Sequence, residues 1–341
     1  MKRNIQMNSM ILQVTLLLTG GLASLAWAQT DAFEQRDSFV WQYTGTPCNG
    51  SVCNGWVALD NKSSYQMVTG SGTVYEWRND GSMWAYVGPA CNSSGCPGWV
   101  QVDNDSIVYS IVAGANGVLY KADIDGSIWM YTGTPCDIRI GSCPGWLQID
   151  NSGYNVSLRA GASGLYELRS GGQLFQYVGP ACGAITCPGW VQIDSNPLTT
   201  AVVAGVNGVY ELHSTGSIWQ YTGPSCSRFY CPGWRQLDDN PKAIGIAAGV
   251  SLYQNHSDGT VWEYTGIPCN GSTCPGWKML ANTTSTGGLY ADIGSLYRQT
   301  QNGTILKYTG PACTGIVCPG WQVIDLTGFV NLLSNTGYVP L

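Results

Sequence analysis

Seven short phrases of the type Trp-x-Tyr recur along the chain, and their aromatic rings are the side chains best suited to contact a ligand. An indole offers a broad apolar face with a polar N–H at its edge, which suits stacking on the C–H face of a sugar. We therefore expect the tryptophans of this phrase to be carbohydrate platforms. Five copies carry tryptophan, at Trp41, Trp84, Trp129, Trp219 and Trp262. Phe175 and Leu306 replace it in the other two copies, where we expect weak or silent sites.

A polar position three residues after a second recurring tyrosine is the other candidate contact. Its occupants are Arg78, Asp123, Arg169, His213, His256 and Thr300. The position is polar in every copy, although the residue differs from copy to copy, and this pattern has two explanations. We favour an exposed rim, and the alternative is a set of similar but unequal pockets in which the arginines and histidines bind the ligand.

Two further side chains recur with a Gly-Trp pair. The tryptophans of that pair are expected to pack blade against blade, with a role as sugar platforms as the alternative. They are Trp56, Trp99, Trp146, Trp190, Trp234, Trp277 and Trp321. An aspartate follows four residues later and is expected to cap a turn, with hydrogen bonding to a sugar hydroxyl as the alternative. Its copies are Asp60, Asp103, Asp150, Asp194, Asp238 and Asp325, and Ala281 breaks the series.

The chain offers little that could catalyse a reaction. An enzyme would need a paired acid and base, an activated nucleophile or a metal cluster near the centre of the molecule. Asp292 is the lone carboxylate expected there, and local structural divergence explains it better than catalysis. Histidine occurs only twice, at His213 and His256, so we expect no metal site and no cofactor. The sequence therefore predicts a protein that is not an enzyme.

These residues belong to a repeat of about 44 residues, a period typical of β-propeller blades. Each copy contains Tyr-x-Gly, a proline and a pair of cysteines shortly before Gly-Trp, and the third copy has a longer loop between its cysteines. The intervening residues alternate as short strands do, and no ten-residue helical pattern is present. We predict an all-β fold, a seven-bladed β-propeller whose ring is closed by terminal strands.

All 14 cysteines fall into seven local pairs. In an exported protein such pairs are expected to form disulfides, each of which would hold its own hairpin rather than join two blades. The pairs are Cys48 and Cys53, Cys91 and Cys96, Cys136 and Cys143, Cys182 and Cys187, Cys226 and Cys231, Cys269 and Cys274, and Cys313 and Cys318.

The first 28 residues have the pattern of a secretory signal peptide. Lys2 and Arg3 precede an apolar stretch, and small residues at Ala26 and Ala28 suit cleavage. We expect residues 1–28 to be the signal, 29–39 a lead-in and 40–341 the propeller. The protein is then secreted, or periplasmic in a bacterium, and the apolar stretch is too short to span a membrane.

The ring needs strands from both ends of the chain. We expect the chain to begin partway through a blade, at residues 40–60, and to end with the inner strands that this blade lacks. Residues 33–36 also resemble an inner strand and compete for that place with residues 338–341, a choice that the sequence leaves open.

Charge restricts the partners. The formal net charge is -6, and only 11% of the residues are charged. Removing residues 1–28 would take away two cations and no acid, which moves the net charge to -8. A partner recognised through phosphate neutralisation, such as nucleic acid, is therefore not expected. The oligomeric state remains open.

The order of these motifs in residues 189–221 resembles the tectonin or tachylectin-like β-propeller lectins. There Gly-Trp-x-x-Ile-Asp is followed by Ala-Gly-x-x-Gly-Val-Tyr and then by Gly-Ser-Ile-Trp-x-Tyr. The resemblance covers residues 40–341 and implies a secreted ring that binds microbial or cell-surface glycans without catalysis. Two features depart from that family: its familiar rings have six blades, and the cysteine pair is an addition. No binding residue is carried over.

Three functions are therefore compared. The leading hypothesis is a multivalent carbohydrate-binding protein, which predicts several similar pockets. The first alternative is an extracellular protein-interaction scaffold, which predicts a contiguous apolar patch on one face of the disc. A polysaccharide-active hydrolase is less favoured, since it requires a unique acidic centre.

Overall fold

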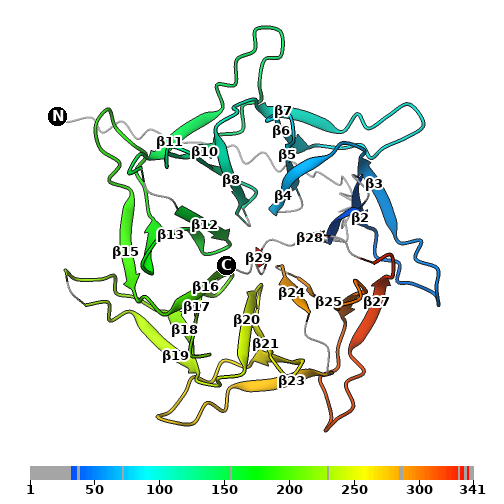
Figure 1. Ribbon diagram of the computed structural model, residues 1–341, viewed down its shortest axis with the longest axis vertical. Helices are drawn as coiled ribbons and strands as arrows, with labels where there is room; N and C mark the ends of the chain where they lie inside the picture. Colours follow the sequence, from blue (N-terminus) through cyan, green and yellow to red (C-terminus); the bar gives the residue numbers. More distant parts are fainter. Residues whose placement is uncertain are drawn as a thin grey trace, which may run out of the picture.

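Seven antiparallel sheets stand around a central axis and form a disc (Figure 1). The computed structural model describes residues 32–36, 39–70, 73–114, 116–153, 156–228, 230–283, 287–292, 294–328, 331–333 and 336–337. These ranges contain strands and turns but no helix, and hence no helix that could cross a membrane. The predicted seven-bladed β-propeller is confirmed. The expected signal peptide lies outside the described residues.

Five blades each consist of four consecutive strands, ordered from the axis to the rim. Blade 2 holds β4 (Ser64–Gly70), β5 (Thr73–Arg78), β6 (Met83–Tyr86) and β7 (Trp99–Asp103). Blade 3 holds β8 (Val108–Ala113), β9 (Leu119–Asp123), β10 (Ile128–Tyr131) and β11 (Trp146–Asp150). Blade 4 holds β12 (Val156–Gly161), β13 (Gly164–Arg169), β14 (Gln173–Tyr177) and β15 (Trp190–Ser195). Blade 5 holds β16 (Thr199–Gly205), β17 (Gly208–His213), β18 (Ile218–Tyr221) and β19 (Trp234–Asp238). Blade 6 holds β20 (Ala243–Ala248), β21 (Leu252–His256), β22 (Thr260–Tyr264) and β23 (Trp277–Asn282).

Blades 1 and 7 contain the strands from the two ends of the chain. Blade 7 holds β24 (Gly288–Ala291), β25 (Leu296–Gln299), β26 (Ile305–Tyr308) and β27 (Trp321–Asp325), with β29 (Thr336–Gly337) paired to β24 near the axis. Blade 1 holds β28 (Asn331–Leu333), β1 (Phe33–Arg36), β2 (Phe39–Tyr43) and β3 (Trp56–Asp60).

Closure of the ring combines three N-terminal strands with one C-terminal strand. β1 pairs with β2 on one side and with β28 on the other, where Phe33 lies opposite Leu333. The expectation that the C-terminus supplies both inner strands of blade 1 is thus wrong, because β1 occupies the second position. Residues 338–341, the competing candidate, lie outside the described residues. The pairing joins the two chain ends and leaves no open edge between the first and last blades.

The inner strands approach one another closely at the axis. A Cβ atom on Gly161 would lie 1.8 Å from the carbonyl oxygen of Ala204, and one on Gly249 would lie 1.7 Å from that of Asp292. Only glycine fits such approaches between backbones. Farther out, apolar side chains fill the space between neighbouring sheets, as Leu212 and Ile246 do between blades 5 and 6. The core is thus divided into slabs, one between each pair of blades.

Candidate functional site

Every Gly-Trp tryptophan joins its blade to the preceding one. Its indole Nε1 donates a hydrogen bond of 2.8–2.9 Å to a backbone carbonyl on the outer strand of the neighbouring blade. The pairs are Trp56 with Ile324, Trp99 with Leu59, Trp146 with Val102, Trp190 with Ile149, Trp234 with Ile193, Trp277 with Leu237, and Trp321 with Leu280. The blade-packing interpretation of this set is confirmed.

We predict that Trp234→Phe lowers the free energy of unfolding by about 1–3 kcal/mol, because the carbonyl of Ile193 loses its partner. Trp219→Phe in the same blade is the matched control, since its Nε1 donates to the Ser217 hydroxyl and the ring is half-buried. Urea unfolding of both variants measures the difference. Equal losses would show that the hydrogen bond between blades contributes nothing of its own.

Each disulfide loop also contacts the preceding blade. All seven predicted disulfides are present, and the bridge in blade 3 closes the longer loop between Cys136 and Cys143. The bonds lie within blades, as expected. However, the backbone N–H of the first cysteine donates to the neighbouring outer strand in every copy, for example from Cys226 to Gln192 at 3.0 Å. The loops therefore help to join the blades through their backbone.

A charged cluster lies at the joint between blades 1 and 2. Arg78 donates to the Asp60 carboxylate across the joint at 2.7 Å and to Glu76 on its own strand at 3.0 Å. Its guanidinium carbon lies 4.4 Å from the centre of the Trp84 ring, within cation–π range. One candidate cation thus contacts two acids and covers one candidate platform.

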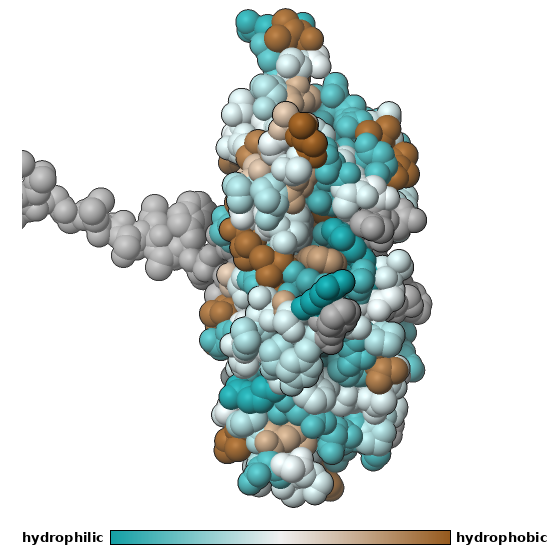
Figure 2. All heavy atoms as spheres, turned by 90° about the vertical axis from the view of Figure 1, so that its left-hand side faces the viewer, coloured by the Kyte–Doolittle hydropathy of each residue, from teal (hydrophilic) through white to brown (hydrophobic). Residues whose placement is uncertain are grey.

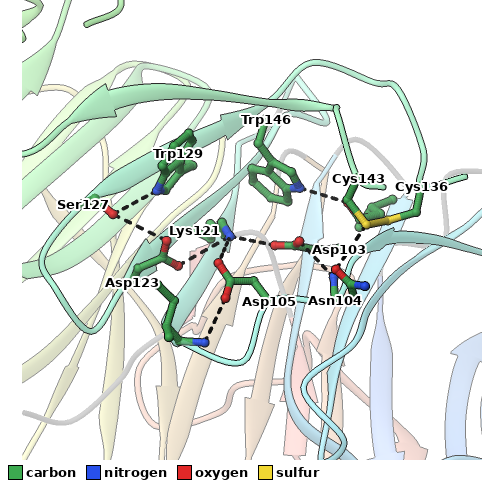
Figure 3. Close-up of polar contacts among 12 residues, drawn as sticks. Asp103, Asn104, Asp105, Lys121, Asp123, Ser127, Trp129, Cys136, Cys143 and Trp146 are labelled. Atoms are coloured by element: carbon green, nitrogen blue, oxygen red, sulfur yellow. Dashed lines mark hydrogen bonds and ion pairs between the residues drawn. A yellow bond between two sulfur atoms is a disulfide. The ribbon is translucent and has the colours of Figure 1, made fainter. Parts of the chain in front are cut away.

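Blade 3 has the same cluster with the charges exchanged (Figure 3). Lys121 takes the place of the glutamate, and its Nζ lies 2.7 Å from Asp103, 3.1 Å from Asp105 and 3.6 Å from Asp123. Its ammonium lies between the Trp129 and Trp146 rings, 5.9 and 5.1 Å from their centres.

The remaining sequence-predicted contacts occupy equivalent positions. Arg169 pairs with Glu167 and covers the Phe175 ring, with its guanidinium carbon 4.1 Å from the ring centre. In blades 1, 5 and 6 the cation or imidazole lies beside the candidate indole. These pairs are Arg36 with Trp41 at 4.7 Å, His213 with Trp219 at 5.9 Å, and His256 with Trp262 at 5.8 Å.

The exposed-rim interpretation of this polar position is wrong. Asp123, His213 and His256 are only 4%, 7% and 3% exposed. The reason is that strand alternation puts this position on the same side as the buried residue two before it, and its arginines and histidines pack beside an aromatic ring on the third strand of their own blade. The five candidate indoles remain half-buried, with one side occupied by a group of the protein itself.

Most of the recurring aspartates cap turns as expected, and Asp60 instead accepts from Arg78. Asp150 accepts from the backbone N–H of Ser152 at 3.1 Å, and Asp325 accepts from Thr327 at 2.9 Å. The acids also face the next blade, as Asp325 does toward Arg36 at 3.3 Å across the ring closure. Asp292 is likewise a turn cap, since its Oδ1 accepts from the N–H groups of Gly294 and Ser295.

Burial perturbs the glutamates of these joints. It raises the pKa of Glu34 to about 8, helped by repulsion from Asp325 and opposed by Arg36. Burial also raises the pKa of Glu211 to about 7. The folded protein therefore holds protons that the unfolded chain releases at lower pH.

This difference predicts that stability falls as pH rises from about 4.5 to about 8. The raised folded pKa of Glu34 contributes stability below the unfolded pKa that is lost on passing through the folded one. Glu34→Gln should flatten the profile, because the amide has no proton to release. Unfolding free energies measured at several pH values test this, and a wild type that gains stability over that range would contradict it.

One face of the disc carries exposed apolar side chains over blades 2 and 3. Tyr65 is 70% exposed, Tyr109 56%, Ile124 64% and Ile107 40%. Tyr65 and Tyr109 are the extra residues of equivalent bulges in the inner strands β4 and β8, where the register shifts by one. A bulge turns its extra residue out of the sheet. We call these four residues the face patch.

Backbone contacts place the loops of the face patch together. The N–H of Ile124 donates to the carbonyl of Ile107 at 2.7 Å, which joins a hairpin turn to the loop before β8. Gly81 in the blade 2 hairpin turn would place a Cβ 3.7 Å from the Cα of Ser106 in that same loop. The inner strands are tied by Gln66, whose side chain exchanges two hydrogen bonds with the backbone of Ile111.

A small depression between blades 6 and 7 has a different character. Its lining includes Asn255, His256 and Arg298. Asn255 Oδ1 and His256 Nε2 are buried and have no hydrogen-bond partner among the described residues. Burial lowers the pKa of His256, so its imidazole is neutral at pH 7.

Fold and site together define a disulfide-stapled, seven-bladed β-propeller. No protein-family model matches the chain, and no curated protein matches it. Among solved structures it is similar to Prp20p of Saccharomyces cerevisiae, with TM-score 0.55 and 13% identity over 91% of this chain and 92% of that one. A second structure of the same protein, yeast RCC1 (Prp20) bound to Kap60, matches with TM-score 0.56 and 13% identity over 100% of this chain and 97% of that one. At these identities the likeness shows the fold alone.

Proposed function

We propose that this protein is an exported β-propeller scaffold that binds a partner protein through the face patch and catalyses no reaction. The observation that carries the proposal is the gathering of Tyr65, Ile107, Tyr109 and Ile124 on one face. Large exposed apolar side chains that lie together mark interfaces, and tyrosine is enriched among the residues that dominate binding energy. The seven disulfides are consistent with an extracellular or periplasmic location.

Charges around the face patch define the partner further. Asp80 and Asp125 are exposed in the hairpin turns of blades 2 and 3, and Asp105 is half-exposed in the loop between blades 2 and 3. Hydrogen bonds from Ser82 and Ser127 lower the pKa of Asp80 and Asp125, so both are charged at neutral pH. A partner with lysine or arginine around an apolar centre would complement this face.

One structural neighbour, seen in two structures, supports a protein partner as a use of this fold. Prp20p, which is yeast RCC1, is described for its binding to Gsp1p and histones in one and as bound to Kap60 in the other. This chain is proposed to share the mode of action, which is binding through a rigid disc, and not those partners.

The test is affinity capture from extracellular proteins with the wild type and with Tyr65→Ser/Tyr109→Ser. The double variant should reduce capture of the specific partner more than tenfold, since a tyrosine that dominates an interface contributes about 2 kcal/mol. Val250→Ser is the control, because Val250 is exposed in the loop between β20 and β21, outside the face patch. Excess free sugars should not release the partner. Release by sugars, or equal capture by the double variant, would overturn the proposal.

Glycan binding is the second candidate, motivated by two hydrogen-bond acceptors between blades 6 and 7, His256 Nε2 and Asn255 Oδ1, that have no partner among the described residues. Both atoms are buried, so a sugar hydroxyl would reach them only where this joint opens. A glycan array tests this candidate: it requires a signal that His256→Ala removes, and silence on neutral, fucosylated, mannosylated and methylated sugars would dismiss it.

A further inference from the structure

The disulfide loops project from the rim of the disc as separate hairpins (Figure 1). Their tips differ in chemistry from blade to blade. Blades 2 and 6 have polar tips, with the sequences Asn-Ser-Ser-Gly at 92–95 and Asn-Gly-Ser-Thr at 270–273. The consecutive blades 3, 4 and 5 carry apolar tips instead. Figure 2 shows the loop of blade 3 as a knob at the top of the disc, coloured partly as hydrophobic.

Exposure of these apolar tips is nearly complete. Ile138 and Ile140 in blade 3 are each 75% exposed, Ile185 in blade 4 is 87% exposed, and Tyr230 in blade 5 is 68% exposed. None of these side chains supports the core, so the isoleucines have no structural need to be apolar. Burying such residues against a partner gains free energy in proportion to the apolar area removed from water.

The loops are held in shape without a partner. A disulfide closes each base, and the tip of blade 3 is fixed by the Asp137 carboxylate, which accepts from the N–H of Arg139 at 3.0 Å. In blade 5 the N–H of Ser227 donates to the carbonyl of Tyr230 at 2.8 Å. Rigid tips lose little conformational entropy when they are buried.

We infer that the edge formed by blades 3, 4 and 5 docks on a lipid surface. The three tips point outward from successive sectors of the rim and form no continuous groove for a folded protein, whereas the fluid headgroup region of a bilayer can take up separate convex contacts. Arg139 and Arg228 lie exposed in the same loops, against the single acid Asp137, so this edge is locally cationic although the net charge of the chain is -6. Arginine beside isoleucine and tyrosine suits a lipid interface, where the cation meets anionic headgroups and the apolar groups lie deeper.

Docking by the edge stands the disc upright on the membrane and leaves the face patch open to a partner. The inference does not depend on the proposed function, because the edge and the face share no residues. The apolar tips of blades 7 and 1, at Ile316, Val317 and Val52, form a second arc whose loops contain no arginine. That arc provides a matched control.

The experiment is flotation of the disulfide-intact protein with vesicles of phosphatidylcholine alone or mixed with phosphatidylserine. We expect binding that is several-fold stronger with phosphatidylserine, and Ile138→Ser/Ile140→Ser/Ile185→Ser should reduce it more than tenfold. Arg139→Gln/Arg228→Gln should abolish the preference for phosphatidylserine. Ile316→Ser/Val317→Ser should bind as the wild type does, and unchanged thermal unfolding should show that every variant is folded.

Two outcomes would overturn the inference. One is a wild type that floats with neither kind of vesicle, which would show that the tips do not bind lipid and would favour a protein partner for them. The other is a triple variant that still binds as the wild type does. Neither outcome affects the capture experiment on the face patch, so the two proposals fail separately.

Discussion

Gly189→Ala should destabilise the propeller by about 3 kcal/mol, although it adds only one methyl group. The new Cβ would lie 2.3 Å from the carbonyl oxygen of Pro180 and 2.6 Å from Cε2 of Tyr177. Backbone and a packed ring cannot both withdraw, so the disulfide loop must move away from the blade. Thermal unfolding should show the loss as a lower midpoint, by about 2–4 °C for each kcal/mol.

The same loop contains the control for this substitution. A Cβ on Gly183 would have its nearest neighbour, the carbonyl oxygen of Thr186, at 3.9 Å. Gly183→Ala should therefore change the midpoint little. If both variants unfold at the same temperature, close contact around the Gly-Trp glycine is not what holds the loop against its blade.

A charge exchange at the joint between blades 2 and 3 should have an effect of similar size. Lys121→Glu places a carboxylate among Asp103, Asp105 and Asp123, and we expect a loss of about 3–5 kcal/mol. Adding Asp123→Arg should restore most of that loss. The double variant reproduces the Glu76 and Arg78 arrangement of blade 2, in which the arginine reaches the preceding aspartate and covers the indole.

A double-mutant cycle in urea measures the coupling directly. Asp123→Arg alone should also destabilise, because it adds a second cation beside Lys121. Losses that simply add in the double variant would show that the joints of blades 2 and 3 are not equivalent structures.

The repeat made the fold predictable. Seven cysteine pairs at a nearly constant spacing, each next to Gly-Trp, can be satisfied only by seven equivalent units. The packing of the Gly-Trp indoles between blades could also be predicted, because this tryptophan is present in all seven copies of the repeat. The repeat did not show which strands close the ring in blade 1. The reason is that β1 lies in a short stretch with no neighbouring cysteine pair. Its Glu34-x-Arg36 matches Glu76-x-Arg78, and that match was the available signal.

Burial of the polar position could not be read from one blade. Some of its partners come from the preceding blade, as Asp60 does for Arg78, and others from a neighbouring strand of the same blade, as Trp84 does. A signal did exist in the sequence, because the charged residues at neighbouring positions of the repeat change together from blade to blade. Lys121 accompanies Asp123 where other blades have glutamate and arginine, and Arg298 replaces the glutamate in the blade that follows Ala281. Such exchanges indicate groups in contact.

The face patch was invisible for a different reason. Tyr65 and Tyr109 belong to strands whose alternation places every second residue inward, and only the bulges turn both rings to solvent. A scaffold function predicted an apolar patch on one face without naming its residues. The candidate indoles, in contrast, could be named from the sequence, while the groups that cover them could not.

Site-specific photo-crosslinking tests the central claim most directly. A photoreactive phenylalanine analogue replaces Tyr109 in the face patch or Val250 outside it, and the protein is irradiated among extracellular proteins with and without excess free sugars. We expect one protein partner to crosslink from position 109, at the same yield in sugar, and none from position 250. Crosslinking only from position 250, or a crosslink at 109 that free sugars abolish, would contradict partner binding through the face patch.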